Sequence, residues 1–255
     1  MNIIQAVILG IVEGITEFLP VSSTGHLILT TNLLNINPTE FVKSFEVAIQ
    51  VGAICAVIVL YRKDLFRLEM IKKLAVAFIP TAIVGLVFYP FIKEQLLESN
   101  SVVLWSLFLG GLFLILFEYH FNERENSVAE VQSISYKQSL VIGSFQAIAV
   151  IPGVSRAAAT IIGGLVSGIK RRAIVEFSFL LAVPTMIAAT GLDLTRSYKD
   201  FESGSFGVLA VGFITAFIVA MAAIKYFLRF IQRHDFKPFG IYRIVIALVF
   251  WWFLM

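Results

Sequence analysis

The sequence has little charge and a single cysteine. Only 15% of its 255 residues are charged and 58% are hydrophobic, whereas a soluble domain carries about 25% charged residues. Two runs without Asp, Glu, Lys, Arg or His, Leu74–Ile92 and Gly204–Ile224, match the roughly 20 residues that cross a bilayer. These features exclude a soluble enzyme, a nucleic-acid binder and a disordered scaffold, so we expect a membrane protein.

Several other signals are missing. Cys55 has no partner for an internal disulfide, so we expect it to be a packing residue. The N-terminus has no basic region and carries Glu13 and Glu17, which argues against a cleaved signal peptide. The chain has no glycine-rich nucleotide loop, no Cys/His metal cluster and no HExxH motif. The net charge of +3 does not indicate nucleic acid, because basic residues of a membrane protein gather on one face.

The apolar segments predict an all-α, multi-pass membrane protein. Six of them predict spans, at about 45–61, 74–92, 101–118, 174–192, 205–224 and 239–255. Two more, Ile3–Leu34 and Gln138–Ile169, are interrupted at Leu19–Gly25 and Pro152–Arg156 by residues that break helices. The halves of the first would reach only about 24 and 16 Å, short of the roughly 30 Å hydrocarbon core. We therefore expect two re-entrant hairpins.

The two hairpins also indicate an internal repeat. When the sequence is aligned with itself at an offset of 133 residues, identical residues coincide at four positions of the first hairpin: Gln5, Gly10, Val21 and Ser22. Three predicted spans follow each hairpin, and because three is odd, the second repeat enters the membrane from the opposite side. This pattern is typical of an inverted-topology repeat. We expect a single membrane domain, 1–255, with repeats at about 1–119 and 138–255.

The basic residues predict the orientation. Fifteen of the 20 Lys and Arg lie in segments expected on one side, at 62–73, 120–137, 170–172 and 225–243. Four lie on the other side, namely Lys43, Lys93, Arg196 and Lys199. Because basic loops stay in the cytoplasm, we expect the first hairpin to open outward and the second to the cytoplasm. Their tips then meet near the midplane, and both termini lie outside.

Ionisable residues inside apolar segments are candidates for function. Four stand out: Glu13, Glu17, His26 and Arg156. Glu13 and Glu17 are four residues apart, so their carboxylates share one helical face and are expected to face a common site. Two alternatives are that they pair with Arg156 and fasten the hairpins together, or that they lie in solvent at the outer rim.

Hydroxyl residues stand at the start of the second half of each hairpin. Ser22, Ser23 and Thr24 precede one half-helix and Ser155 precedes the other. These hydroxyls are either N-caps or ligand contacts, and a helix N-terminus also favours an anion. Arg156 adds a planar fork of donors suited to phosphate. The pattern therefore predicts an oxyanion site where two half-helices meet.

His26 follows Ser23 by three residues, and imidazole suits proton transfer near neutral pH. Beside two carboxylates and several hydroxyls we expect it to be catalytic, the alternative being a packing histidine. Glu46 and Gln50, also four residues apart, either join the site or cap the first span.

Two motifs resemble those of bacterial undecaprenyl-diphosphate phosphatases, the bacitracin-resistance family: EGITEFLPVSSTGH at Glu13–His26 and PGVSR at Pro152–Arg156. The resemblance covers essentially the whole chain. It implies a plasma-membrane enzyme that hydrolyses undecaprenyl diphosphate to undecaprenyl phosphate and phosphate, recycling the carrier for peptidoglycan synthesis and conferring bacitracin tolerance. A transporter or flippase for a lipid phosphate or another anion is the alternative, because inverted repeats also build transporter sites.

The resemblance also assigns roles. The family's essential carboxylates fall on Glu13 and Glu17, its serine on Ser23, its histidine on His26 and its arginine on Arg156. Together with the pattern at the two half-helix starts, this leads us to expect catalytic roles for Glu17, Ser23, His26 and Arg156. We expect the substrate to be bound by Glu13, Ser22, Thr24, Gly153, Ser155 and Arg156. The chain departs from the family at Ala157, where a hydroxyl residue often follows the arginine. The implied partners are a polyprenyl diphosphate lipid and the bilayer, without nucleic acid, and with a homodimer as an open possibility.

The expected chemistry follows from these residues. Ser23 is the expected nucleophile, with His26 accepting its proton, and the alternative is water held on Glu17 or a metal. Two glutamates repel a diphosphate unless one is protonated or a divalent cation lies between them. We expect a Mg²⁺ or Ca²⁺ requirement with Glu13 and Glu17 as ligands, and a site open to the extracytoplasmic side.

Overall fold

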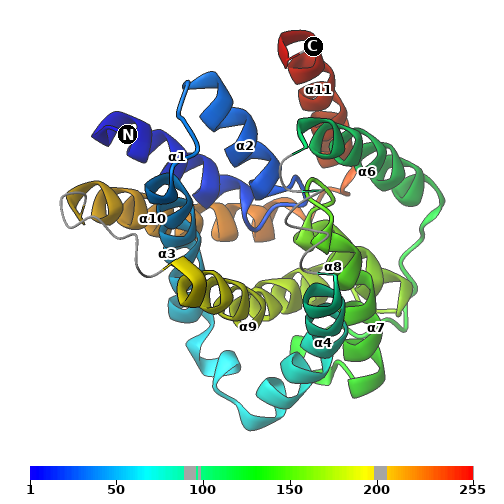
Figure 1. Ribbon diagram of the computed structural model, residues 1–255. Helices are drawn as coiled ribbons and strands as arrows, with labels where there is room; N and C mark the ends of the chain where they lie inside the picture. Colours follow the sequence, from blue (N-terminus) through cyan, green and yellow to red (C-terminus); the bar gives the residue numbers. More distant parts are fainter. Residues whose placement is uncertain (89–95, 97–98, 198–205, 255) are drawn as a thin grey trace.

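The computed structural model describes residues 1–88, 96, 99–197 and 206–254, and these ranges are almost entirely helical (Figure 1). The α-helices are α1 (Ile3–Thr16), α2 (Ser23–Leu33), α3 (Glu40–Leu65), α4 (Leu68–Val87), α6 (Asn100–His120), α7 (Tyr136–Gln146), α8 (Arg156–Val166), α9 (Arg171–Ser197), α10 (Phe206–Phe230) and α11 (Lys237–Leu254). Two 3₁₀ turns, η2 (Val131–Ser133) and η3 (Ala147–Val150), complete the regular structure. The described ranges contain one isolated β-bridge, Val128 to Ile169, and no strand. The all-α prediction is confirmed.

Five of the described helices are long and apolar enough to cross a membrane: α3, α4, α6, α9 over Arg171–Gly191, and α10. The protein is therefore a multi-pass membrane protein, as predicted. The sixth predicted span falls on α11. Helices extend beyond the predicted spans because polar turns continue them. The Thr39 side chain, for example, caps α3 at the backbone N–H of Val42. Parts of the predicted spans, at 89–92, 205 and 255, lie outside the described residues, as do Lys93 and Lys199.

The two predicted hairpins are α1 with α2, and α7 and η3 with α8. Each begins with a capping box, formed by Asn2 with Gln5 and by Ser135 with Gln138. In each hairpin the same glutamine joins the two arms. Gln5 Nε2 donates to the Leu34 carbonyl at 3.4 Å, and Gln138 Nε2 donates to the Ser167 carbonyl at 3.0 Å. All these pairs are 133 residues apart. The repeat boundaries stay a prediction, which this correspondence supports.

The first arm of each hairpin packs on a long helix from the other half of the chain. The helix α1 packs on α10, and α7 packs on α4, while α6 packs on α11 (Figure 1). Small residues allow this close approach. A Cβ at Gly14 would lie 2.8 Å from the Ala216 carbonyl oxygen, and one at Gly143 would overlap the Ala77 carbonyl. Close backbone packing at small residues is a typical way to hold helices together in membranes.

Two contacts hold α9 against its neighbours. Phe18, fully buried, packs edge-to-face on Phe179 of α9, with ring centroids 5.5 Å apart. At the start of α9, Arg171 donates to Oε2 of Glu118, which lies near the end of α6, at 2.6 Å. The Phe18 contact places the turn after α1 against α9, where the site described next is found.

Candidate active site

Two turns form the centre of the site. The first tip is Glu17–Ser22, between α1 and α2, and the second tip is Ile151–Ser155, between η3 and α8. The tips end in serines with positive φ, 72° at Ser22 and 79° at Ser155. Such φ values are uncommon outside glycine and persist only where the surroundings hold them. The two tips therefore share an unusual backbone that starts a short helix.

Both tip serines are N-caps. Ser22 Oγ accepts the N–H of Gly25 at 3.4 Å, and Ser155 Oγ accepts the N–H of Ala158 at 3.2 Å. The capping alternative therefore accounts for the side chain of Ser22. The first N–H groups of an α-helix have no intrahelical acceptor, so the N–H groups at the starts of α2 and α8 can still bind an anion.

Glu17 joins the two hairpins. Ser23 Oγ donates to Glu17 Oε2 at 2.5 Å. Arg156 Nη2 donates to Glu17 Oε1 at 3.2 Å and to the Glu17 carbonyl at 3.3 Å. The Glu17 and Arg156 side chains are only 3% and 12% exposed. The structure thus brings together three of the four predicted catalytic residues, and for Glu17 it also shows the fastening contact with Arg156.

Arg156 keeps part of its donor capacity free. Its Nη1 donates to the Ser178 carbonyl at 2.9 Å, whereas its Nε is buried without a hydrogen-bond partner among the described residues. Ala157 follows Arg156, so the hydroxyl that the family often has at this position is missing. A hydroxyl stands one helical turn later instead: Thr160 Oγ1 lies 2.6 Å from Ser178 Oγ. Arg156 is therefore held in place by backbone carbonyls and Glu17, while its Nε–H has no partner among the described residues.

Glu13 is completely buried one turn before Glu17, and neither carboxylate oxygen has a hydrogen-bond partner in the described part of the chain. Its charged neighbours are Glu17, Glu46 and Arg156, so the structure brings Glu46 of α3 toward the site. A buried, unpaired carboxylate is very unfavourable. Glu13 must therefore carry a proton or face a cation.

The residues present fit a divalent cation. The unpartnered oxygens of Glu13 and the carboxylate of Glu17 are hard oxygen ligands, and Mg²⁺ is usually held by one or two carboxylates together with water and substrate phosphate. The described residues contain no group of three or more His, Cys, Asp or Glu side chains that could hold a metal. A metal here would need ligands from the substrate.

The ring nitrogens of His26 are hydrogen-bonded to groups other than Ser23, whose proton the imidazole was expected to accept. Its Nδ1 lies 2.7 Å from the Ser22 carbonyl, and its Nε2 lies 2.8 Å from the Tyr242 hydroxyl. Because a carbonyl only accepts, Nδ1 carries the proton and neutral Nε2 accepts from Tyr242. The rings of His26 and Tyr242 are stacked at 5.4 Å. The helix directs this ring back onto Ser22, and the Ser23 hydroxyl donates to Glu17 instead of to His26. The catalytic role of His26 stays a prediction.

The remaining predicted residues lie around the tips. Thr24 is half-buried at the second position of α2. Gly153 has φ +92°, and a Cβ there would lie 2.7 Å from the Val103 carbonyl oxygen of α6. This close approach alone requires glycine, so the structure gives Gly153 a packing role beside its predicted binding role.

Arg243 is a buried residue of the site that sequence reasoning missed. It was counted with the cytoplasmic basic residues of 225–243, but its side chain is completely buried against both tips. Without Arg243, 14 of the 15 basic residues still lie on the predicted cytoplasmic side, against four on the other side, so the predicted orientation is unchanged. An arginine inside the predicted 239–255 span was the available signal, since such residues are functional candidates by default.

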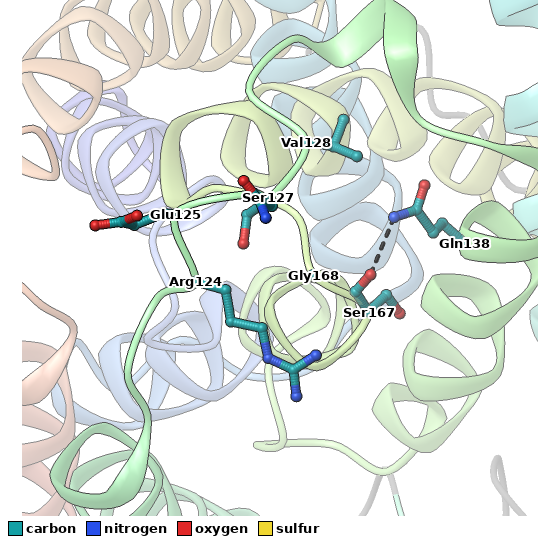
Figure 2. A pocket seen from close by; sticks show the side chains of 8 residues that line it. Arg124, Glu125, Ser127, Val128, Gln138, Ser167 and Gly168 are labelled. Carbon is teal, nitrogen blue, oxygen red and sulfur yellow. Dashed lines mark hydrogen bonds between the residues drawn. The ribbon is translucent and has the colours of Figure 1, made fainter.

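A separate hollow lies at the open end of the second hairpin, away from the tips. It measures about 650 Å³ and is lined by residues of the 124–128 loop with Gln138, Ser167 and Gly168. Figure 2 shows two of these lining residues joined by a hydrogen bond, in which Gln138 donates to the Ser167 carbonyl. None of the predicted site residues lines it, so we do not assign the chemistry to this hollow.

Comparisons with known proteins agree over nearly the whole chain. The model of the family described as bacitracin resistance protein BacA matches residues 6–249. A protein of Wolinella succinogenes named undecaprenyl-diphosphatase is 50% identical over 255 residues, which cover 100% of this chain and 99% of the relative. Proteins of the same name from Aquifex aeolicus and Methanococcus aeolicus are 51% and 42% identical over 247 and 250 residues, or 96% and 98% of this chain and 96% and 97% of those relatives.

Proposed function

Because the chain belongs to the bacitracin resistance protein family, we propose that it hydrolyses undecaprenyl diphosphate to undecaprenyl phosphate and inorganic phosphate. The observation that carries this proposal is the Ser23–Glu17–Arg156 contact at two facing half-helix N-termini. It combines a nucleophilic hydroxyl, a carboxylate that can accept its proton, and cationic donors for phosphate. The product is the lipid carrier for peptidoglycan synthesis, and its recycling underlies bacitracin tolerance.

Substrate binding is proposed at the two N-termini. The free N–H groups at the starts of α2 and α8 and the unpartnered Nε of Arg156 would hold oxygens of the terminal phosphate. Ser22, Thr24, Gly153 and Ser155 would shape this cradle through their backbone. Donors fixed in this way stabilise the charge that develops in the transition state.

The proposed nucleophile is Ser23, with Glu17 as its base. Ser23 Oγ attacks the terminal phosphorus, its proton passes to Glu17, and the bond from that phosphorus to the bridging oxygen of the lipid monophosphate breaks. Water then attacks the phosphoserine and restores Ser23, and phosphate leaves. Direct attack by water activated on Glu17 gives the same products without a phosphoserine. In either route His26 positions the start of α2 through Ser22.

A divalent cation is part of the proposal. Mg²⁺ or Ca²⁺ held by Glu13 and Glu17 would offset the charge of the two carboxylates and so reduce their repulsion of the diphosphate. The unpartnered oxygens of Glu13 support this assignment. The alternative is a proton shared between Glu13 and Glu17. A titration of activity with Mg²⁺ and Ca²⁺ distinguishes the two, because a shared proton needs no metal.

The orientation and location are also proposed. The basic segments would face the cytoplasm, the site would open to the extracytoplasmic side of a bacterial plasma membrane, and the polyprenyl chain would lie along the apolar exterior. Association into a homodimer stays a prediction. The matching hairpins favour a transporter or flippase as the rival function.

Phosphate release from undecaprenyl diphosphate by the purified protein in detergent micelles tests the function. Hydrolysis under these conditions supports the enzyme, because transport cannot occur without compartments. The transporter would be favoured if a monodisperse protein that binds the lipid releases no phosphate at any Mg²⁺ or Ca²⁺ concentration.

A further inference from the structure

Arg243 is satisfied entirely by backbone carbonyls. A guanidinium group has five N–H donors, and each of those of Arg243 meets a carbonyl at 2.9 to 3.4 Å. The acceptors are Pro20 of the first tip, Gly153 and Val154 of the second tip, and Ser106 and Leu107 of α6. One nitrogen, Nη1, binds the carbonyls of Pro20 and Val154 together. Arg243 therefore holds the two tips to each other and to α6.

This arrangement has no counterion among the described residues. Arg243 is completely buried and forms no ion pair with a described carboxylate. Buried arginines are rare unless paired, and a Lys ammonium offers only three donors. A Lys at position 243 would therefore lose at least two of these five hydrogen bonds, so the geometry of both tips depends on this side chain.

The packing of α6 on α11 makes room for Arg243. A Cβ at Gly110 would overlap Arg243 Nη2, and a Cβ at Gly111 would lie 2.6 Å from the Gly240 carbonyl oxygen. These glycines bring the two helices close enough for Arg243 to reach across α6 into the tips. The contact is therefore built by four separate parts of the chain: α11, α6 and the two tips.

The preceding residue of α11 holds the first hairpin by a second route. The Tyr242 hydroxyl donates to His26 Nε2 at 2.8 Å, and His26 Nδ1 donates to the Ser22 carbonyl at 2.7 Å. Tyr242 thus acts on the peptide that begins α2. Consecutive residues of α11 reach both half-helix N-termini.

We propose that Tyr242 and Arg243 are positioning residues that fix the two half-helix N-termini relative to each other and so align Arg156 with Glu17 and Ser23. We call this pair the α11 clasp. Arg243 cannot itself hold phosphate, because all five of its donors are occupied and the side chain is completely buried. Its effect on hydrolysis must pass through the tips, and misplacement of reacting groups by 1 Å can cost about 100-fold in rate.

The first test compares Arg243→Lys with Arg171→Lys, each as the full-length protein in detergent. Arg171 is the matched control, because its guanidinium is also largely buried, donates to Glu118 and lies over the Phe121 ring, away from the tips. Arg243→Lys should lower kcat by about 10- to 100-fold and change KM by less than about threefold, because the phosphate contacts remain. Arg171→Lys should leave both constants within about threefold of the original protein, although its unfolding temperature falls.

Tyr242→Phe keeps the stacked ring and removes only the hydroxyl. We expect kcat to fall by about 3- to 10-fold, the loss of one hydrogen bond. Because both residues act on the first tip, the double variant should lose less than the product of the two single losses. Equal kcat in the original protein and both single variants would overturn the clasp.

Hydrogen exchange of the backbone separates this proposal, which rests on the proposed hydrolysis, from the hydrolysis itself. Arg243→Lys should speed exchange in peptides covering residues 20–26 and 152–158 together, whereas Arg171→Lys should not. Faster exchange at both tips in a protein without any hydrolysis would retain the clasp and refute the function. Unchanged exchange at both tips would refute the clasp, whatever the rates of hydrolysis. This measurement also decides the case in which Arg243→Lys is poorly stable.

Discussion

Replacing Ser23 and Glu17, singly and together, tests whether they act as a nucleophile and its base. Ser23 Oγ donates to Glu17 Oε2 at 2.5 Å, so Glu17 is within reach of the serine proton. A general base contributes about 10²- to 10⁴-fold, which corresponds to about 2.7–5.4 kcal/mol of transition-state stabilisation. Ser23→Ala and Glu17→Gln should each lower kcat by at least this range, because each removes one partner of the same proton transfer.

The double variant separates this mechanism from the alternative. If the two residues act in one step, Ser23→Ala with Glu17→Gln should be about as slow as the slower single variant, since residues that act as a unit are far from additive. Independent losses would multiply to about 10⁴-fold or more. A multiplied loss would refute the serine mechanism and favour water activated on Glu17, with Ser23 as a phosphate contact.

The assay must separate chemistry from folding. Glu17→Gln removes the charged partner of Arg156 in a pair only 3% and 12% exposed, and a hydrogen bond to a charged group contributes about 1.5–3 kcal/mol to stability. Unfolding temperature and monodispersity are therefore measured beside phosphate release at saturating Mg²⁺. Ser139→Ala is the control, because Ser139 is a fully buried serine of α7 whose hydroxyl donates to the Ser135 carbonyl, within the same helix. Acid quench and mass analysis should reveal phosphate on Ser23 in the original protein.

Three further predictions concern the metal, the phosphate contact and the orientation. Glu13→Gln should lower kcat at low Mg²⁺ by about 10-fold or more and recover in part at high Mg²⁺; a loss independent of the metal concentration would contradict a ligand role. Arg156→Lys should lower turnover by about 10²-fold in a protein that stays monodisperse, and near-normal turnover would return Arg156 to a purely structural role. In a Cys55→Ser background, Lys43→Cys should react with impermeant thiol reagents outside intact cells and Lys72→Cys should not, since these lysines are 60% and 51% exposed on opposite predicted sides; the reverse labelling would overturn the orientation.

The hairpins could be predicted from the sequence because their cause is local. Each apolar segment is interrupted, by Pro20 in the first and by Pro152 and Gly153 in the second, and neither half of the first segment is long enough to cross a bilayer. The interruptions fall where the structure has its tips. Helix ends were less predictable, since hydropathy marks the lipid-facing part of a helix and not its polar first turns. The start of α3 at Glu40, five residues before the predicted span, is the clearest case.

The contacts within the site could be predicted only in part. Carboxylates, serine and arginine in apolar surroundings stand out in any sequence, but which oxygen meets which donor depends on packing between distant helices. His26 is the example: spacing placed it near Ser23, whereas a tyrosine 216 residues away decides where its ring lies. Arg243 was missed because counting charges by loop assigns a helical residue at the edge of a span to water.

The two hairpins match in scaffold but not in chemistry. Their capping boxes, tip serines and arm contacts recur at 133 residues, yet the reactive positions differ. Glu13 corresponds to Gln146, Glu17 to Val150, Ser23 to Arg156, and His26 to Ala159. The first hairpin therefore supplies the acidic and nucleophilic groups, and the second supplies the Arg156 guanidinium.

This division explains why the tips must be held together. A phosphate bound at one N-terminus alone would meet either Ser23 and Glu17 without the Arg156 guanidinium, or Arg156 without a nucleophile. The Arg156–Glu17 contact exists only where the two tips meet, with the guanidinium of Arg243 bonded to carbonyls of both. A symmetric scaffold with two complementary halves thus makes one composite site, and its reactivity depends on the register between the hairpins as much as on the residues they carry.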